Sequence, residues 1–165
     1  LQKVIPEHIQ TLLSKLEEMG CDIKINKNEV TLSSPKKLKA VDIKTMPYPG
    51  FPTDMQSVFA SMLTVAKGTS VVVENIFEHR YKYISELTKM RAEITIEGKT
   101  AVIKGVNKLM GATVESKDLR GGASLVLAGL AADGETKVNG VHYIERGYEN
   151  FVENLQGIGA LVEKL

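Results

Sequence analysis

The chain has 165 residues, 43% of them hydrophobic, which suffices for one compact domain with a core of ordinary size. Lys and Arg number 21 against 20 Asp and Glu, and this balance lacks the strongly positive field on which nonspecific nucleic-acid binding depends, so we expect no nucleic-acid partner. One cysteine, Cys21, excludes an intrachain disulfide and favours a reducing compartment, so we expect a cytoplasmic protein.

Two kinds of segment recur along the chain. The first surrounds Leu16, Leu87 and Leu155, which are spaced by about 70 residues. The second covers residues 54–80 and recurs at residues 118–146. A period of this length is typical of repeated supersecondary units, so we expect successive units that each hold two helices.

The chain opens on the first kind of segment. Apolar residues recur at helical spacing over residues 6–19, Pro6 suits a first helical turn, and Gly20 suits the position after a helix end, so we predict a helix there. Residues 22–25 and 29–32 then alternate apolar and polar side chains around a polar turn, which predicts a hairpin.

The second kind of segment begins at a sequence that matches a capping box. In it, Thr53 would accept a hydrogen bond from the Gln56 amide, and the Gln56 side chain would reach back. We therefore predict a helix from Asp54 to about Ala66, ended by Gly68.

Strands are predicted after both helices of the second kind, at residues 71–75 and 136–139. A second hairpin is predicted over residues 93–97 and 100–104, around a Gly-Lys turn. The resulting order of helix, strand, helix, strand, strand indicates a mixed α/β fold.

Both ends of the chain interrupt the repeat. The third copy stops at Leu165 inside an expected strand whose counterparts continue into a partner strand, and the first copy begins at its second helix. We therefore expect residues 1–165 to form a single, incomplete domain of about two and a half units, whose missing pieces lie upstream in a longer protein.

A proline-rich loop leads into the first candidate site residue. Pro47, Pro49 and Pro52 hold the chain extended until the helix begins. Asp54 then lies in the first turn, where the helix dipole keeps its carboxylate ionised and able to accept protons or hydrogen bonds. In the alternative interpretation, Asp54 only complements the dipole.

In the second copy of this segment, at residues 118–124, charged and small residues favour the binding of an anion. Asp118 and Arg120 precede small residues at 121–124, which let a ligand or neighbouring backbone approach closely, and free amides with a guanidinium favour an anion there. Alternatively, Asp118 is only an N-cap and Arg120 a solvated surface charge.

Glu78 and Arg80 recur as Glu145 and Arg146, each pair after a strand and before the next helix. Paired arginines can clamp a phosphate or carboxylate through two hydrogen bonds each. In the alternative, glutamate–arginine pairs tie the repeats together.

The chain lacks the sequence signals of several common sites. His8, His79 and His142 match no metal-ligand spacing, so we expect no metal, and Cys21 is interpreted as a packing residue. There is no P-loop, Gly-x-Ser-x-Gly elbow or dinucleotide fingerprint, and we expect no cofactor. The longest uncharged apolar run, residues 123–132, is far shorter than the about 20 residues of a membrane span, so we expect no membrane partner.

Four motifs, in this order, resemble the UDP-N-acetylglucosamine enolpyruvyl transferases. They are PYPGFPTDMQ at 47–56, ENIFEHR at 74–80, DLRGGASLVLAG at 118–129 and HYIERGYE at 142–149. The similarity extends over nearly the whole chain and corresponds to the C-terminal part of that two-domain enzyme.

This resemblance implies a fold and an activity. Family members are built from repeated βαβαββ units, arranged as an inside-out α/β barrel in each of two domains. They transfer the enolpyruvyl group of phosphoenolpyruvate to the 3′-hydroxyl of UDP-N-acetylglucosamine and release phosphate, in bacterial peptidoglycan synthesis. These two substrates are the partners we expect.

The resemblance also implies roles for individual residues. Asp54 matches the carboxylate that binds the sugar and is proposed as the base for its hydroxyl. Ile76 matches a position whose backbone contacts the UDP-sugar, and Arg146 matches an arginine that engages phosphoenolpyruvate. The remaining matches line the same cleft with less certain individual roles: Glu78, Arg80, Asp118 and Arg120.

Parts of that family's machinery have no counterpart in the chain. The cysteine-bearing mobile loop, a lysine near the N-terminus and the arginines of the other domain are missing, so we expect the isolated chain to be inert and to bind UDP-sugar weakly. Arg91 also departs from the internal pattern, since the other copies have Gly20 and Gly159 there.

Two alternatives stay open. The related transferase of shikimate metabolism is disfavoured, because the motif at residues 47–56 resembles the UDP-sugar enzyme. A stand-alone interaction module would use an exposed strand around residues 161–165 to recruit a partner strand.

Overall fold

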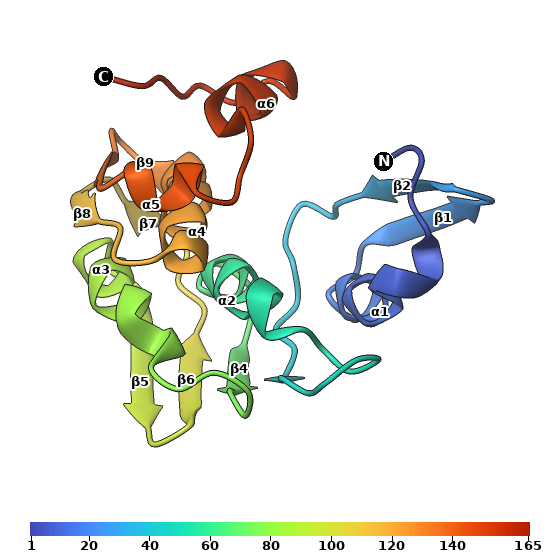
Figure 1. Ribbon diagram of the computed structural model, residues 1–165. Coiled ribbons are helices and arrows are strands. Elements are labelled where there is room, and N and C mark those ends of the chain that lie inside the picture. Colours follow the sequence, from blue (N-terminus) through green and yellow to red (C-terminus); the bar gives the residue numbers. More distant parts are fainter.

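The computed structural model describes all 165 residues, Leu1–Leu165. Its first group of elements is half a unit, namely one helical segment and one hairpin, as predicted. The bounds are η1 Pro6–Ile9, α1 Gln10–Glu18, β1 Asp22–Asn26 and β2 Glu29–Ser33. Figure 1 shows this group beside the rest of the molecule, to which an extended segment connects it.

A complete βαβαββ unit follows. Its elements are β3 Ile43–Lys44, η2 Thr53–Met55, α2 Gln56–Leu63, β4 Thr69–Val73, η3 Arg80–Tyr83, α3 Ile84–Lys89, β5 Glu93–Glu97 and β6 Thr100–Lys104. They build a sheet of order β3-β4-β6-β5, in which β3 is parallel to β4 and the other neighbours are antiparallel. The predicted strand and hairpin are confirmed, and the predicted helix ends slightly early, at Leu63.

The third group repeats the strand, helix, strand and helix with which that unit begins. Its elements are β7 Leu109–Met110, β8 Thr113–Glu115, α4 Leu119–Leu130, β9 Ala132–Asp133, β10 Lys137–Asn139, α5 His142–Glu145 and α6 Phe151–Gly157. The strands β8 and β10 pair in parallel around α4, as β3 and β4 do around α2. The α/β class is confirmed, while the four sheets stay open and do not by themselves close a barrel. No helix combines the length and apolar character needed to cross a bilayer.

The prediction of a strand around residues 161–165 is wrong. The chain has no helix or strand after α6, and Leu161 and Leu165 are 98% and 91% exposed. A strand needs a hydrogen-bonded neighbour, which β5 finds in β6, whereas this segment pairs with no other strand.

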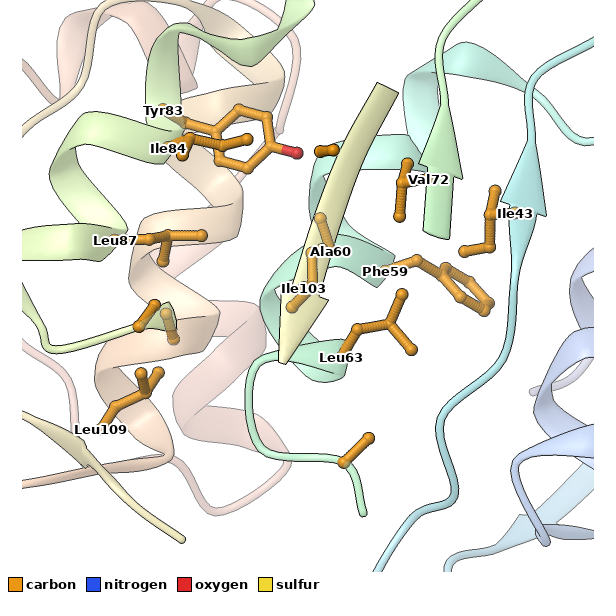
Figure 2. Packing of buried hydrophobic residues seen from close by; sticks show 14 of the residues in the cluster. Ile43, Phe59, Ala60, Leu63, Val72, Tyr83, Ile84, Leu87, Ile103 and Leu109 are labelled. Atoms are coloured by element: carbon orange, nitrogen blue, oxygen red, sulfur yellow. The ribbon is translucent and has the colours of Figure 1, made fainter. Parts of the chain in front are cut away.

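The main core lies on both sides of α2. On one side, Phe59 and Leu63 point toward Val72 of β4 and Ile43 of β3 (Figure 2). On the other side, residues of α3 and α4 complete the same cluster of 20 buried residues, among them Leu87. Burying a side chain of this size stabilises the fold by about 2 kcal/mol, so this cluster fixes α2 and α4 relative to each other.

Three helices of the repeat end in the same way. Gly20, Arg91 and Gly159 have positive φ angles of 99°, 66° and 93°, and the next N–H in each case donates to the carbonyl of the repeated leucine. This is a Schellman-type helix end. Arg91 therefore occupies a left-handed position that its two counterparts fill with glycine, which costs about 1 kcal/mol.

Candidate functional site

The proline loop is anchored before it reaches Asp54, but the prediction that it stays extended is wrong, because it turns back on itself with the Gly50 N–H donating to the Pro47 carbonyl at 2.8 Å. The Met46 N–H donates to the Phe51 carbonyl at 3.0 Å, and the buried Phe51 ring packs edge-on against Phe59 with centroids 4.9 Å apart. Such an aromatic pair adds about 1 kcal/mol. Asp54 thus directly follows a loop that is fixed in place, and it lies in the first helical turn, η2, as predicted.

The capping box predicted at Thr53 does not form. The Thr53 hydroxyl instead donates to Glu74 at 2.9 Å and accepts from Arg80 Nε at 3.2 Å. Gln56 is fully buried, and its Oε1 accepts a hydrogen bond from the Tyr83 hydroxyl at 3.1 Å. These distant partners replace the local cap, although the buried Gln56 Nε2 has no hydrogen-bond partner in the structure.

The Asp54 carboxylate lies between two guanidinium groups. Its Oδ1 is 3.2 Å from Nη2 of Arg80, and its Oδ2 is 2.9 Å from Nη2 of Arg120. Arg80 also lies over the Phe77 ring at 4.3 Å, and Arg120 over the Tyr148 ring at 5.2 Å. The rings restrict both arginines, whereas the Asp54 side chain remains 54% exposed and accessible.

This arrangement keeps the site ionised. The hydrogen bond from Arg120 is the main cause that lowers the pKa of Asp54 below its usual value, against the smaller opposing effect of partial burial. Burial alone would lower the pKa of Arg120, but its hydrogen bond to Asp54 and the proximity of Tyr148 raise it. Asp54 is therefore a carboxylate at neutral pH, able to accept hydrogen bonds on its exposed side.

A hollow of about 300 Å³ opens beside this cluster. It brings together four of the predicted residues with others that the sequence did not single out. Its lining consists of Asp54, Phe77, His79, Arg80, Lys82, Asp118, Leu119 and Arg120. Cationic side chains outnumber the two carboxylates there, which suits a ligand with negative charge.

The alternatives for Asp118 and Arg120 have different outcomes. Asp118 is indeed the N-cap of α4, since its Oδ1 accepts from the Gly121 N–H at 2.8 Å. Arg120 is not a solvated surface charge, because its side chain is 26% exposed and paired with Asp54. The small residues admit neighbouring protein rather than a ligand: a Cβ on Gly122 would lie 2.1 Å from Ser116 Oγ.

Three predicted residues do not line the hollow. The Ile76 side chain is 46% exposed, and its N–H already donates to Glu74 at 2.9 Å. Glu78 and Arg146 are exposed and form no ion pair within the chain. The alternative interpretation, in which glutamate–arginine pairs tie the repeats together, is therefore wrong, because Arg80 pairs with Asp54 and Glu145 with Lys164.

Other candidate features lie elsewhere in the molecule. Cys21 is buried, and burial raises the pKa of its thiol, as expected for a packing residue. No three His, Cys, Asp or Glu side chains come together in an arrangement that could hold a metal. A groove of about 500 Å³ separates α1 from β3 and β4 and contains none of the predicted residues; it is lined by Gln10, Thr11, Ser14, Lys15, Asp42, Ile43, Lys44, Phe51, Val71 and Val73.

Sequence reasoning missed the buried carboxylate of Glu74. It is 3% exposed and joins the start of η2 to the segment after β4. The available signal was an acidic residue directly after a buried strand, a place where burial of a charge requires specific partners.

Residues 1–155 match the family model for EPSP synthase (3-phosphoshikimate 1-carboxyvinyltransferase). The chain belongs to this family.

Curated relatives in this family carry a more specific name. UDP-N-acetylglucosamine 1-carboxyvinyltransferase 2 of Bacillus cereus is 49% identical over 97% of this chain and 37% of its own length. The enzyme 1 of Caldanaerobacter subterraneus subsp. tengcongensis is 49% identical over 98% of this chain and 39% of its own length. A 1-carboxyvinyltransferase of Desulfofundulus thermocisternus is also 49% identical, and the match covers 67% of it. The chain thus spans well under half the length of the first two relatives.

Solved structures agree with the fold. The enolpyruvyl transferase NikO from Streptomyces tendae matches 92% of this chain and 35% of its own chain with a TM-score of 0.82 and 28% identity. EPSP synthase from Acinetobacter baumannii matches 94% of this chain with a TM-score of 0.69 at 21% identity, which supports the fold alone.

Proposed function

We propose that this chain supplies the C-terminal substrate-binding part of a UDP-N-acetylglucosamine 1-carboxyvinyltransferase. The whole enzyme transfers enolpyruvyl from phosphoenolpyruvate to the sugar 3′-hydroxyl and releases phosphate. In this proposal, residues 1–165 form an incomplete domain that works together with a second domain. The observation that carries it is the exposed Asp54 carboxylate between Arg80 and Arg120, beside a hollow.

Each group has a chemical role in this proposal. Asp54 accepts a hydrogen bond from the sugar hydroxyl and takes its proton as the oxygen attacks. The two arginines now hold Asp54 at a low pKa, which makes it a weak base. When an anionic substrate draws a guanidinium away, the carboxylate becomes a stronger proton acceptor.

The matched residues outside the hollow join the site once the second domain closes over it. Arg146, exposed and unpaired in this chain, then engages phosphoenolpyruvate, and Ile76 contacts the UDP-sugar. Glu78 lies nearby on the same loop as Ile76. Closure also excludes water from the reacting groups.

The shikimate alternative receives less support than the UDP-sugar enzyme. The family description names the shikimate enzyme, but the curated relatives at 49% identity are named for the UDP-sugar. The interaction-module alternative rested on a strand at residues 161–165 that the structure does not contain.

The test is reconstitution of activity. The chain is mixed with the part of the Bacillus cereus relative that it does not match, and phosphate release is measured with both substrates. We expect turnover in the mixture, none from the chain alone, and a loss of at least about 100-fold in Asp54→Asn.

Asp133→Asn is the matched control, because Asp133 is 59% exposed and ion-paired like Asp54 but lies on β9, outside the hollow. Equal losses in both variants, or phosphate release from the chain alone, would contradict the proposal.

A further inference from the structure

Glu74 is a buried carboxylate to which the proposed reaction assigns no role. It follows the last residue of β4, and its side chain accepts four hydrogen bonds without a Lys or Arg partner. Three reach Oε1, from the Thr45 hydroxyl at 2.7 Å, the Ile76 N–H at 2.9 Å and the Phe77 N–H at 3.0 Å. The fourth reaches Oε2 from the Thr53 hydroxyl at 2.9 Å. A buried charge is stable only with such full satisfaction.

The Thr53 hydroxyl connects the Glu74 carboxylate to Arg80 through two hydrogen bonds. It has a single proton, which it donates to Glu74, so its oxygen is left to accept from Nε of Arg80 at 3.2 Å. Arg80 in turn places Nη2 against Oδ1 of Asp54 at 3.2 Å. One continuous line of hydrogen bonds therefore runs from Glu74 to Asp54.

We propose that Glu74 is a positioning residue that fixes the direction of the Thr53 hydroxyl and thereby holds Arg80 toward Asp54. This inference rests on the proposed function of the Asp54 site. The same carboxylate accepts hydrogen bonds from the N–H groups of Ile76 and Phe77. It therefore also fixes the backbone that carries the Phe77 ring, over which the Arg80 guanidinium lies.

The inference requires a carboxylate at position 74, which an amide cannot replace. All four partners are donors, and only a carboxylate offers two oxygens with no proton of its own. In Glu74→Gln, the amide NH₂ would face either the Thr53 hydroxyl or the two backbone N–H groups. If it faces Thr53, that oxygen accepts from it and binds Arg80 Nε less well.

The first experiment reads the position of Arg80 without any ligand. The chain has four arginines, so the Nε–H signal of Arg80 in the arginine-labelled chain is identified by its loss in Arg80→Lys. We expect exchange of this proton with water to become about tenfold faster in Glu74→Gln and in Thr53→Val, and to stay unchanged in Thr53→Ser. Thr53→Val removes the acceptor of Arg80 Nε itself and so sets the change in exchange that full loss of this bond produces. Glu74→Asp, which withdraws the carboxylate from Thr53 by one methylene, repeats the test of position 74 if Glu74→Gln does not fold.

The second experiment measures binding of UDP-N-acetylglucosamine to the chain by titration. We expect about fivefold to tenfold weaker binding in Glu74→Gln and Thr53→Val than in the unmodified chain. Glu86→Gln is the matched control, because Glu86 is equally buried, at 2%, but lies on α3 outside the hollow. It should change neither Arg80 exchange nor binding.

The outcomes separate the two proposals. If the unmodified chain binds no UDP-sugar, substrate binding by the isolated chain fails, and Arg80 exchange still decides the role of Glu74. If Arg80 exchange is the same in Glu74→Gln and the unmodified chain, the positioning role of Glu74 is overturned, whatever Thr53→Val does.

Discussion

Asp54 and Arg120 are 66 positions apart in the sequence, and their side chains form an ion pair of 2.9 Å. Each lies near the start of one copy of the same repeated helix, and the Ser57 hydroxyl of the first helix also donates to the Arg120 carbonyl at 3.0 Å. The two helix starts are therefore fixed against each other by both side-chain and backbone contacts. The hollow lies where the two copies meet.

The Asp54–Arg120 pair should contribute modestly to stability. Because Asp54 is half exposed, we expect a coupling of about 0.5 to 1 kcal/mol in a double-mutant cycle of Asp54→Asn and Arg120→Gln, measured by urea unfolding at pH 7. The pKa of Asp54 is lowered in the fold, so this contribution is present above its unfolded pKa and is lost as the pH falls. The more exposed pair of Lys108 and Asp133 is the control, and an equal coupling there would contradict the prediction.

Glu86 should make the fold sensitive to acid. Burial alone would raise its pKa, but hydrogen bonds from Lys89, Lys117 and the Glu115 N–H lower it from 4.5 to about 2. Its folded pKa lies below the unfolded value, so the stability it provides is complete above pH 4.5 and disappears as the pH falls toward 2.

We expect Glu86→Gln to lose about 2 kcal/mol at pH 7, less than the full pKa shift implies because both lysines are half exposed. The loss should shrink as the pH is lowered from 4.5 to 2, in unfolding curves measured at several pH values. Glu93→Gln, at an exposed ion pair on β5, should show a much smaller effect. A pH-independent loss in Glu86→Gln would refute this explanation.

Gly122 should tolerate no side chain. A Cβ there would lie 2.1 Å from Ser116 Oγ and 2.7 Å from Ile144 Cγ1, both buried, so Gly122→Ala forces the start of α4 away from its neighbours. We expect a loss of about 2 kcal/mol in thermal or urea unfolding. At Gly157, in α6, a Cβ meets nothing within 4 Å, so Gly157→Ala should be neutral or slightly stabilising. Equal effects of the two changes would argue against steric exclusion.

Replacing Arg91 by glycine should stabilise the fold. Its φ of 66° is the left-handed conformation that Gly20 and Gly159 adopt at the equivalent helix ends. Arg91→Gly should raise the free energy of unfolding by up to about 1 kcal/mol, and Gly20→Ala should lower it by about 1 kcal/mol. Urea unfolding of both variants checks the prediction, and a destabilised Arg91→Gly would show that the arginine side chain makes a compensating contact.

Local patterns predicted the repeated elements well. The helix ended by Gly20 and the two hairpins depend on spacing and turn residues that lie within a few positions of each other. The same reasoning failed at Thr53, whose hydroxyl binds Glu74 and Arg80 instead of capping its own helix. It also failed near Leu161, because a strand depends on a partner that local sequence does not reveal.

The site was predicted only in part. Asp54, Arg80, Asp118 and Arg120 were singled out and lie around one hollow, while the assignment of Arg146 stays a prediction. The role of Glu74 could not be predicted, because it depends on contacts with residues more than 20 positions away.

The duplicated helix start carries an acid in both copies, and the two acids have different fates. The Asp118 side chain caps α4 by accepting a hydrogen bond from the Gly121 N–H. The segment η2 begins without a side-chain cap, so the Asp54 carboxylate accepts no hydrogen bond from a backbone N–H. The uncapped entry into the first helix thus leaves both oxygens of Asp54 to its two arginine partners. An ideal capped start at Thr53 would make the two copies more alike and disconnect Arg80 from its hydroxyl partner.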